Sequence, residues 1–265
     1  MIAPLLVAVL AAPVIPADST PKTDARCCAV LELRQYTLHP GQRDVLIELF
    51  ERAFVETQEA VGIELVGTFR DLDRPDRFVW IRGFPDMPSR AASLQAFYGG
   101  PVWQAHRGAA NATMIDSDNV LLLRPSGKDS GFAKPTAPRA PAGATVRSHM
   151  RVLATIYDVA APIDDAFRRF FDDELSPVLA DARAAPIARL ETEPAENTFP
   201  RLPVRTGEHV FVWLARFDDD AALRASEERL AASPQWTALK PKLDRMLKSP
   251  PEHLVLEPTA RSRLR

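Results

Sequence analysis

The chain contains the same short segment twice, and this repeat limits what it can fold into. Residues 78–84 read FVWIRGF and residues 211–217 read FVWLARF, so the two copies begin 133 residues apart. The same spacing relates two further pairs of segments: PVW at 101–103 with PQW at 234–236, and LRP at 123–125 with LEP at 256–258. Three matches at one spacing indicate an internal duplication, so the chain is predicted to be two copies of one unit.

Each copy is predicted to contain a strand, a helix, two strands, a helix and a final strand. In the first copy, apolar residues recur at three- and four-residue steps from Val45 to Phe54, which is typical of a helix with one buried face. The strands of this copy are expected at 29–38, 63–70, 77–84 and 119–124. This order is that of a ferredoxin-like unit, in which two helices cover one face of a four-stranded antiparallel sheet. The predicted fold class is therefore α+β, with two tandem ferredoxin-like (βαββαβ) units.

Composition places the boundaries of these units. Residues 1–28 are expected to be a leader, 29–125 the first unit, 126–145 a linker rich in Pro, Gly and Ala, and 146–265 the second unit. The second copy is about nine residues longer in the loop at 192–203, between its second and third strands. Such an insertion is either a tolerated surface loop or a place that contacts a ligand or partner.

The N-terminal segment favours export. Residues 2–12 form an apolar run that is too short and too broken by proline to span a bilayer, and it resembles the core of a signal peptide. The predicted location is therefore periplasmic or secreted, and the alternative is a cytoplasmic protein whose start codon is misassigned. Cys27 and Cys28 are expected to be reduced or incidental thiols in a flexible leader, because adjacent cysteines form only a strained disulfide.

Charge and spacing exclude several kinds of site. The net charge is −2 and no basic cluster is present, which argues against a nucleic-acid partner. The five histidines show none of the close spacings that bind metals, and the sequence contains no phosphate loop or nucleophile motif. No catalytic residue, metal ligand or membrane-spanning segment is predicted.

Several motifs together resemble the NIPSNAP family. They are ELRQY at 32–36 with PG at 40–41, FVW at 78–80 and the tryptophan after Pro101 in the first copy, and NTFPR at 197–201 with VFVW at 210–213 in the second. The resemblance covers about 29–125 and 146–258. It implies the dimeric α/β-barrel superfamily, in which two sheets pair to enclose a barrel, here within one chain. The family has no agreed catalytic residues, and related barrels include haem-degrading and quinone-forming monooxygenases as well as small-molecule binders.

Alternation along the first strand separates two sets of side chains. Leu31 and Leu33, with Val152, Ala154 and Ile156 of the second copy, are expected to face the helices. The other set is then expected to line the barrel and to bind a polar ligand. The candidate ligand-binding residues are Glu32, Arg34, Tyr36, Trp80, Arg82, His149, Tyr157 and Trp213. The alternative is structural: buried charges often pair with each other, and aromatic stripes on strands are usually core.

The favoured function is a NIPSNAP-like protein that binds a small molecule or acts as a non-catalytic scaffold. Whether it is an enzyme stays open. One alternative is a monooxygenase-like or haem-handling enzyme, for which His149 is the histidine to test as a haem ligand. Another is a protein-interaction module that forms homo-oligomers through exposed sheet edges.

Overall fold

The computed structural model describes residues 26–265, and eight strands of this range close one barrel. The strands are β1 (Val30–Leu38), β2 (Glu64–Asp71), β3 (Arg77–Phe84), β4 (Met114–Pro125), β5 (Arg151–Asp158), β6 (Ala188–Thr192), β7 (Val210–Phe217) and β8 (Glu252–Pro258). Around the barrel they follow the order β1-β3-β2-β8-β5-β7-β6-β4, with antiparallel neighbours throughout. The predicted α+β class and the barrel within one chain are therefore confirmed.

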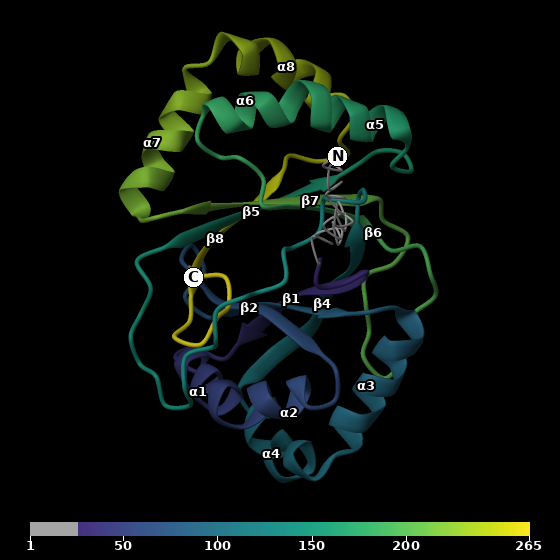
Figure 1. The fold of residues 1–265 in the computed structure, drawn as a ribbon, viewed down its shortest axis with the longest axis vertical. Coiled ribbons are helices and arrows are strands. Elements are labelled where there is room, and N and C mark those ends of the chain that lie inside the picture. The colour runs from purple at the N-terminus through teal and green to yellow at the C-terminus, as the bar shows by residue number, and fades with distance from the viewer. Residues whose placement is uncertain (1–25) are drawn as a thin grey trace, which may run out of the picture.

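Helices cover the barrel in two layers at opposite ends of the molecule (Figure 1). The first half contributes α1 (Arg43–Leu49), α2 (Val55–Glu59), α3 (Met87–Gly99) and α4 (Pro101–Asn111). The second contributes α5 (Asp165–Arg169), α6 (Ser176–Asp181), α7 (Asp220–Ala231) and α8 (Pro234–Asp244). A π-helical turn interrupts the first helix of each half, η1 (Phe50–Phe54) and η2 (Phe170–Leu175). Both halves thus follow the order strand, helix, strand, strand, helix, strand.

The barrel interior is apolar, which corrects the predicted orientation of the strands. Leu31 and Leu33 pack inside the barrel, in one cluster with Val152, Ala154 and Ile156. The set expected to line the barrel instead faces the helices: Tyr36 and Trp80 pack with residues of α1 and α3. Alternation shows which residues share a strand face, but it does not show which face points into the barrel and which toward the helices. If the two faces are exchanged, every residue of the strand is placed on the wrong side.

Short pairings join the two halves. Three residue pairs connect β2 with β8, and three connect β4 with β6. At the second junction Arg124 pairs with Glu191 at 2.8 Å. Within residues 26–265 every strand of the closed barrel has a paired strand on each side. The hypothesis that the chain forms homo-oligomers stays a prediction.

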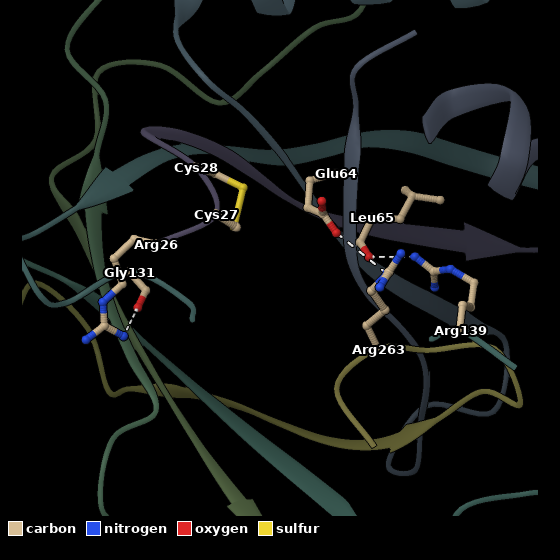
Figure 2. Close-up of a disulfide and its surroundings, with 8 residues drawn as sticks. All are labelled: Arg26, Cys27, Cys28, Glu64, Leu65, Gly131, Arg139 and Arg263. Carbon is tan, nitrogen blue, oxygen red and sulfur yellow. Dashed lines mark hydrogen bonds and ion pairs between the residues drawn. A yellow bond between two sulfur atoms is a disulfide. The ribbon is translucent and has the colours of Figure 1, made fainter. Parts of the chain in front are cut away.

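The linker and the C-terminus both pack on the first half, which the sequence did not indicate. Arg139 of the linker, whose side chain is 7% exposed, donates to the backbone oxygen of Leu65 at 2.9 Å (Figure 2). After β8, the hydroxyl groups of Thr259 and Thr68 lie 2.6 Å apart, and the buried Arg261 pairs with Glu56. These contacts hold the end of the chain against the first half, far from the second-half helices.

Cys27 and Cys28 form a disulfide, so the expectation of unlinked thiols in a flexible leader is wrong (Figure 2). Cys28 is 7% exposed and packs with the apolar barrel residues. Gly83 on β3 makes room for it, because a Cβ atom at this position would lie 2.2 Å from the Cys28 sulfur. The second copy has Arg216 at the matching position, and this side chain is exposed.

We therefore expect Gly83→Ala to lower the free energy of unfolding by about 1–3 kcal/mol, the usual cost of overpacking a filled core. Urea unfolding measures the change. Gly108→Ala is the matched control, because a Cβ atom there meets nothing within 4 Å. In α4 the control should be neutral or stabilising. Equal free energies for the two variants would contradict the close approach of Cys28 to β3.

Within residues 26–265, no helix combines the length and hydropathy needed to cross a membrane. The predicted signal peptide at 2–12 lies outside the described residues, so export stays a prediction.

Candidate functional site

A single carboxylate holds three guanidinium groups between the first-half sheet and its helices. Glu32 lies on β1, Arg34 follows two residues later, Arg82 is its register partner on β3, and Arg90 comes from α3. The closest nitrogen of Arg34 is 2.6 Å from the Glu32 carboxylate, and those of Arg82 and Arg90 are each 2.7 Å away. At most 1% of any of the four residues is exposed. The cluster therefore carries a formal charge of about +2 in a buried environment.

These charges fix the ionisation of Glu32. Burial by itself would raise the pKa of this carboxyl group, but the guanidinium groups of Arg82, Arg34 and Arg90 lower it far below its usual range. Glu32 is therefore ionised at all ordinary pH values, and each arginine keeps at least one charged partner. Glu32 thus pairs both with Arg34 on its own strand and with Arg82 across the strands, as the structural alternative expected of buried charges, but the cluster lies under the helices and not inside the barrel.

The hydroxyl groups of two tyrosines contact the arginines of the cluster. The Arg34 Nε–H donates to the Tyr36 hydroxyl at 3.0 Å, and Arg82 Nη1 makes a longer contact of 3.5 Å with the Tyr98 hydroxyl. The indole of Trp80 lies under both guanidinium groups, 5.4 Å from Arg34 and 4.9 Å from Arg82, as in cation–π contacts. Burial raises the pKa of Tyr36, against the opposing effect of Arg34, so this phenol keeps its proton.

The same two phenols line a cavity of about 260 Å³. Its walls come from β1, β4, α3, α4 and a loop of the second half. The lining residues are Tyr36, Tyr98, Trp103, Arg107, Asn111, Met114, Ser117, Phe199, Arg201 and Leu202. Aromatic rings and two arginines dominate this set, and it contains no Asp or Glu.

The loop between β6 and β7 extends from the second half toward α3 of the first half (Figure 1). It lines the pocket with Phe199, Arg201 and Leu202. Asn197 accepts a hydrogen bond from Arg90 at 2.9 Å, and the Thr198 hydroxyl donates to the backbone oxygen of Met87 at 3.2 Å. Phe199 is 7% exposed and stacks on Tyr98 with ring centroids 5.9 Å apart. The loop that the sequence shows to be longer in the second copy is therefore packed on the first half, and it is not a free surface loop.

The second half has no equivalent cluster. Tyr157 accepts a hydrogen bond from Trp213 Nε1 at 3.0 Å within an apolar core, and burial raises the pKa of Tyr157. Ala215 stands where the first copy has Arg82. His149 is exposed and precedes β5, so the expectation that it reaches the barrel alongside Tyr157 is wrong.

A comparison with known protein families gives a match for the first half, which holds the cluster. The NIPSNAP family model matches residues 31–127. Residues 31–127 form a NIPSNAP domain. This match runs from β1 to just past β4 and includes every residue of the ion cluster. The resemblance of the second copy to NIPSNAP lies outside the matched residues and stays a prediction.

Solved structures resemble the chain in fold. A candidate monooxygenase from Fusobacterium nucleatum subsp. nucleatum has a TM-score of 0.52 at 8% identity, with 87% of this chain and 92% of that chain covered. A candidate monooxygenase from Lactobacillus acidophilus NCFM has a TM-score of 0.48 at 14% identity, with 86% and 92% covered. An uncharacterised NIPSNAP domain protein from Burkholderia xenovorans has a TM-score of 0.35 at 17% identity, with 37% and 95% covered. No curated protein matches the chain. The likeness to the Fusobacterium structure, at 8% identity, extends to the fold alone.

The structure brings five of the eight predicted site residues together in the NIPSNAP domain: Glu32, Arg34, Tyr36, Trp80 and Arg82. Tyr157 and Trp213 lie in the other half and His149 at the surface. The sequence reasoning missed Arg90, Tyr98 and Phe199. One signal was available for the first of these, because Arg90 has helical spacing with the buried Leu94 and Phe97 and so lies on an apolar face.

Proposed function

We propose that this chain binds a small molecule in the pocket of its NIPSNAP domain. The observation that carries the proposal is the construction of the pocket floor. Tyr36 and Tyr98 line the cavity, and each contacts an arginine that the buried Glu32 holds in place. Polar groups that are fixed before a ligand arrives reduce the ordering cost of binding, and aromatic walls with a few placed polar groups are typical of small-molecule sites.

Duplication supports the same proposal. In this view the two halves are diverged copies of one ferredoxin-like unit, and the second copy replaced its polar set with an apolar core while its longer loop came to cover the pocket of the first. A pocket built by both halves explains why Asn197, Thr198 and Phe199 contact the NIPSNAP domain.

We expect the full chain to bind naphthalene-2-carboxylate or its uncharged analogue naphthalene-2-carboxamide, because either can place a flat ring against the aromatic residues that line the cavity. Calorimetric titration measures the affinity. Ser117→Phe fills the cavity from β4 at a half-buried position and should abolish binding while the chain stays folded. Absence of binding by both probes, or binding that survives this substitution, would contradict the proposal.

Monooxygenase chemistry is the second candidate function. The observation that favours it is the fold likeness to the Fusobacterium candidate monooxygenase over 87% of this chain. Mass spectrometry of 1-naphthol after incubation with the protein in air separates the two. A monooxygenase without a cofactor would convert the phenol and O2 to naphthoquinone and water, so the product gains one oxygen atom and loses two hydrogen atoms, whereas a binding protein would return the probe unchanged.

A further inference from the structure

We propose that the ligand carries a carboxylate, held by the hydroxyl groups of Tyr36 and Tyr98. This inference rests on the proposed function, because it names the chemical class of the molecule in the same pocket.

The direction of the hydrogen bonds is the first argument. Arg34 donates to the Tyr36 oxygen, and Arg82 contacts the Tyr98 oxygen through an N–H group. An arginine has no acceptor, so the phenol proton cannot point back at it. Within residues 26–265 neither phenol proton has a hydrogen-bond acceptor in the protein. Both protons are therefore available to an acceptor in the cavity that the phenols line.

Ionisation supports this role. Burial raises the pKa of Tyr36, so its hydroxyl stays protonated and remains a donor. The guanidinium group behind each phenol polarises the O–H bond, which strengthens a hydrogen bond to an anion.

The charge of the cluster is the second argument. Three arginines share one carboxylate, and their remaining partners are neutral: Tyr36 for Arg34, Gln58 and Tyr98 for Arg82, and Asn197 and Thr198 for Arg90. A buried surplus of positive charge is costly unless a negative group lies nearby. A carboxylate on the two phenols would supply that charge next to Arg34 and Arg82.

Unpartnered donors are the third argument. Trp80 Nε1 and Gln58 Nε2 are fully buried atoms without a hydrogen-bond partner. Trp80 lies against Tyr36, and Gln58 lies against Arg82. The surroundings of the cluster thus contain more donors than acceptors, which adds to the electropositive character of the region behind the two phenols.

The entrance of the pocket is positively charged, as the buried cluster is. Arg107 and Arg201 line it from α4 and from the second-half loop, and both are exposed. Exposed arginines at a pocket mouth attract anions. Trp103 and Phe199 form apolar walls, so a flat aromatic carboxylate matches the pocket better than an inorganic anion.

The test compares naphthalene-2-carboxylate with naphthalene-2-carboxamide, which share a shape and differ in charge. Calorimetric titration of the full chain is expected to show at least about tenfold tighter binding of the carboxylate, because hydrogen bonds to a charged acceptor are the stronger ones. Tyr36→Phe and Tyr98→Phe should each weaken carboxylate binding by about tenfold and change carboxamide binding much less.

Tyr157→Phe is the matched control. It removes a buried phenol that accepts one hydrogen bond at the corresponding place of the second half, so it should leave both affinities unchanged. If the two probes bind with equal affinity and Ser117→Phe abolishes the binding of both, the proposal that the ligand carries a carboxylate is wrong, but the pocket is still a binding site. A carboxylate preference that survives in the folded Tyr36→Phe and Tyr98→Phe variants would overturn the phenols as its cause. Binding of neither probe would overturn the proposed function as well.

Discussion

Replacing Glu32 with glutamine is expected to lower the free energy of unfolding by about 3–5 kcal/mol, the cost of removing one partner from a buried ion pair. Glutamine keeps the shape of the side chain and removes its charge. Arg34, Arg82 and Arg90 would then remain buried with no acid in contact, since their other partners are neutral. Because three arginines share this one carboxylate, the loss should reach the upper part of that range.

Urea unfolding of the wild type and Glu32→Gln measures this loss. Glu48→Gln is the control: its carboxylate also pairs with an arginine, Arg52, but 77% of the Glu48 side chain is exposed. Exposed pairs contribute about 0–1 kcal/mol, so the control should unfold almost as the wild type does. A similar, small change in both variants would mean that the cluster does not hold the first half together.

The stabilisation that Glu32 provides is expected to depend on pH. The folded-state pKa of Glu32 lies far below its usual value of 4.5, so the ionised carboxylate stabilises the fold fully above that pH. As the pH falls below about 4.5, the unfolded chain binds a proton at Glu32 and the folded chain does not, so this stabilisation declines. The difference in unfolding free energy between wild type and Glu32→Gln should therefore shrink in acid, and a difference that stays constant from pH 6 to pH 3 would contradict the assignment.

The order of elements was readable from the sequence, because helical periodicity and the repeated FVW segment are local signals. The faces of the strands were not, since alternation is equally consistent with both orientations. Size was the signal that could have decided between them. An eight-stranded barrel has an interior just wide enough to be filled by side chains, and the one here is filled mostly by aliphatic residues such as Leu31, Ile81 and Val212. Phe78 and Trp80 are too bulky to repeat around such an interior, and they pack under the helices.

The pocket itself could be predicted only in part. Glu32, Arg34 and Tyr36 are spaced two residues apart and so share one strand face, which makes their grouping predictable from the sequence. Phe199 reaches Tyr98 across a separation of about a hundred residues, and no local pattern encodes such a contact. The sequence showed that the loop at 192–203 is longer than its counterpart in the first copy. It did not indicate that this loop packs on the first half.

Phe199→Ala is the second change with a large expected effect. Phe199 belongs to the second half by sequence and to the core of the first half by contact, where it stacks on Tyr98. Removing a buried phenylalanine side chain costs about 3–5 kcal/mol. The loss should lie near the lower end, because a loop can move away more easily than a strand and so leave a smaller cavity.

Urea unfolding and titration with naphthalene-2-carboxylate together test this role. Phe170→Ala is the matched control, since Phe170 is 4% exposed in the second-half core and is not part of the pocket lining. Both variants should lose stability, but only Phe199→Ala should also lose probe binding, by about tenfold or more, because it removes a pocket wall. Equal probe binding by the two variants would show that the loop only fastens the halves together. Loss confined to Phe199→Ala would instead mean that a loop of the second half completes the binding site of the first half, so that the site needs both halves of the chain.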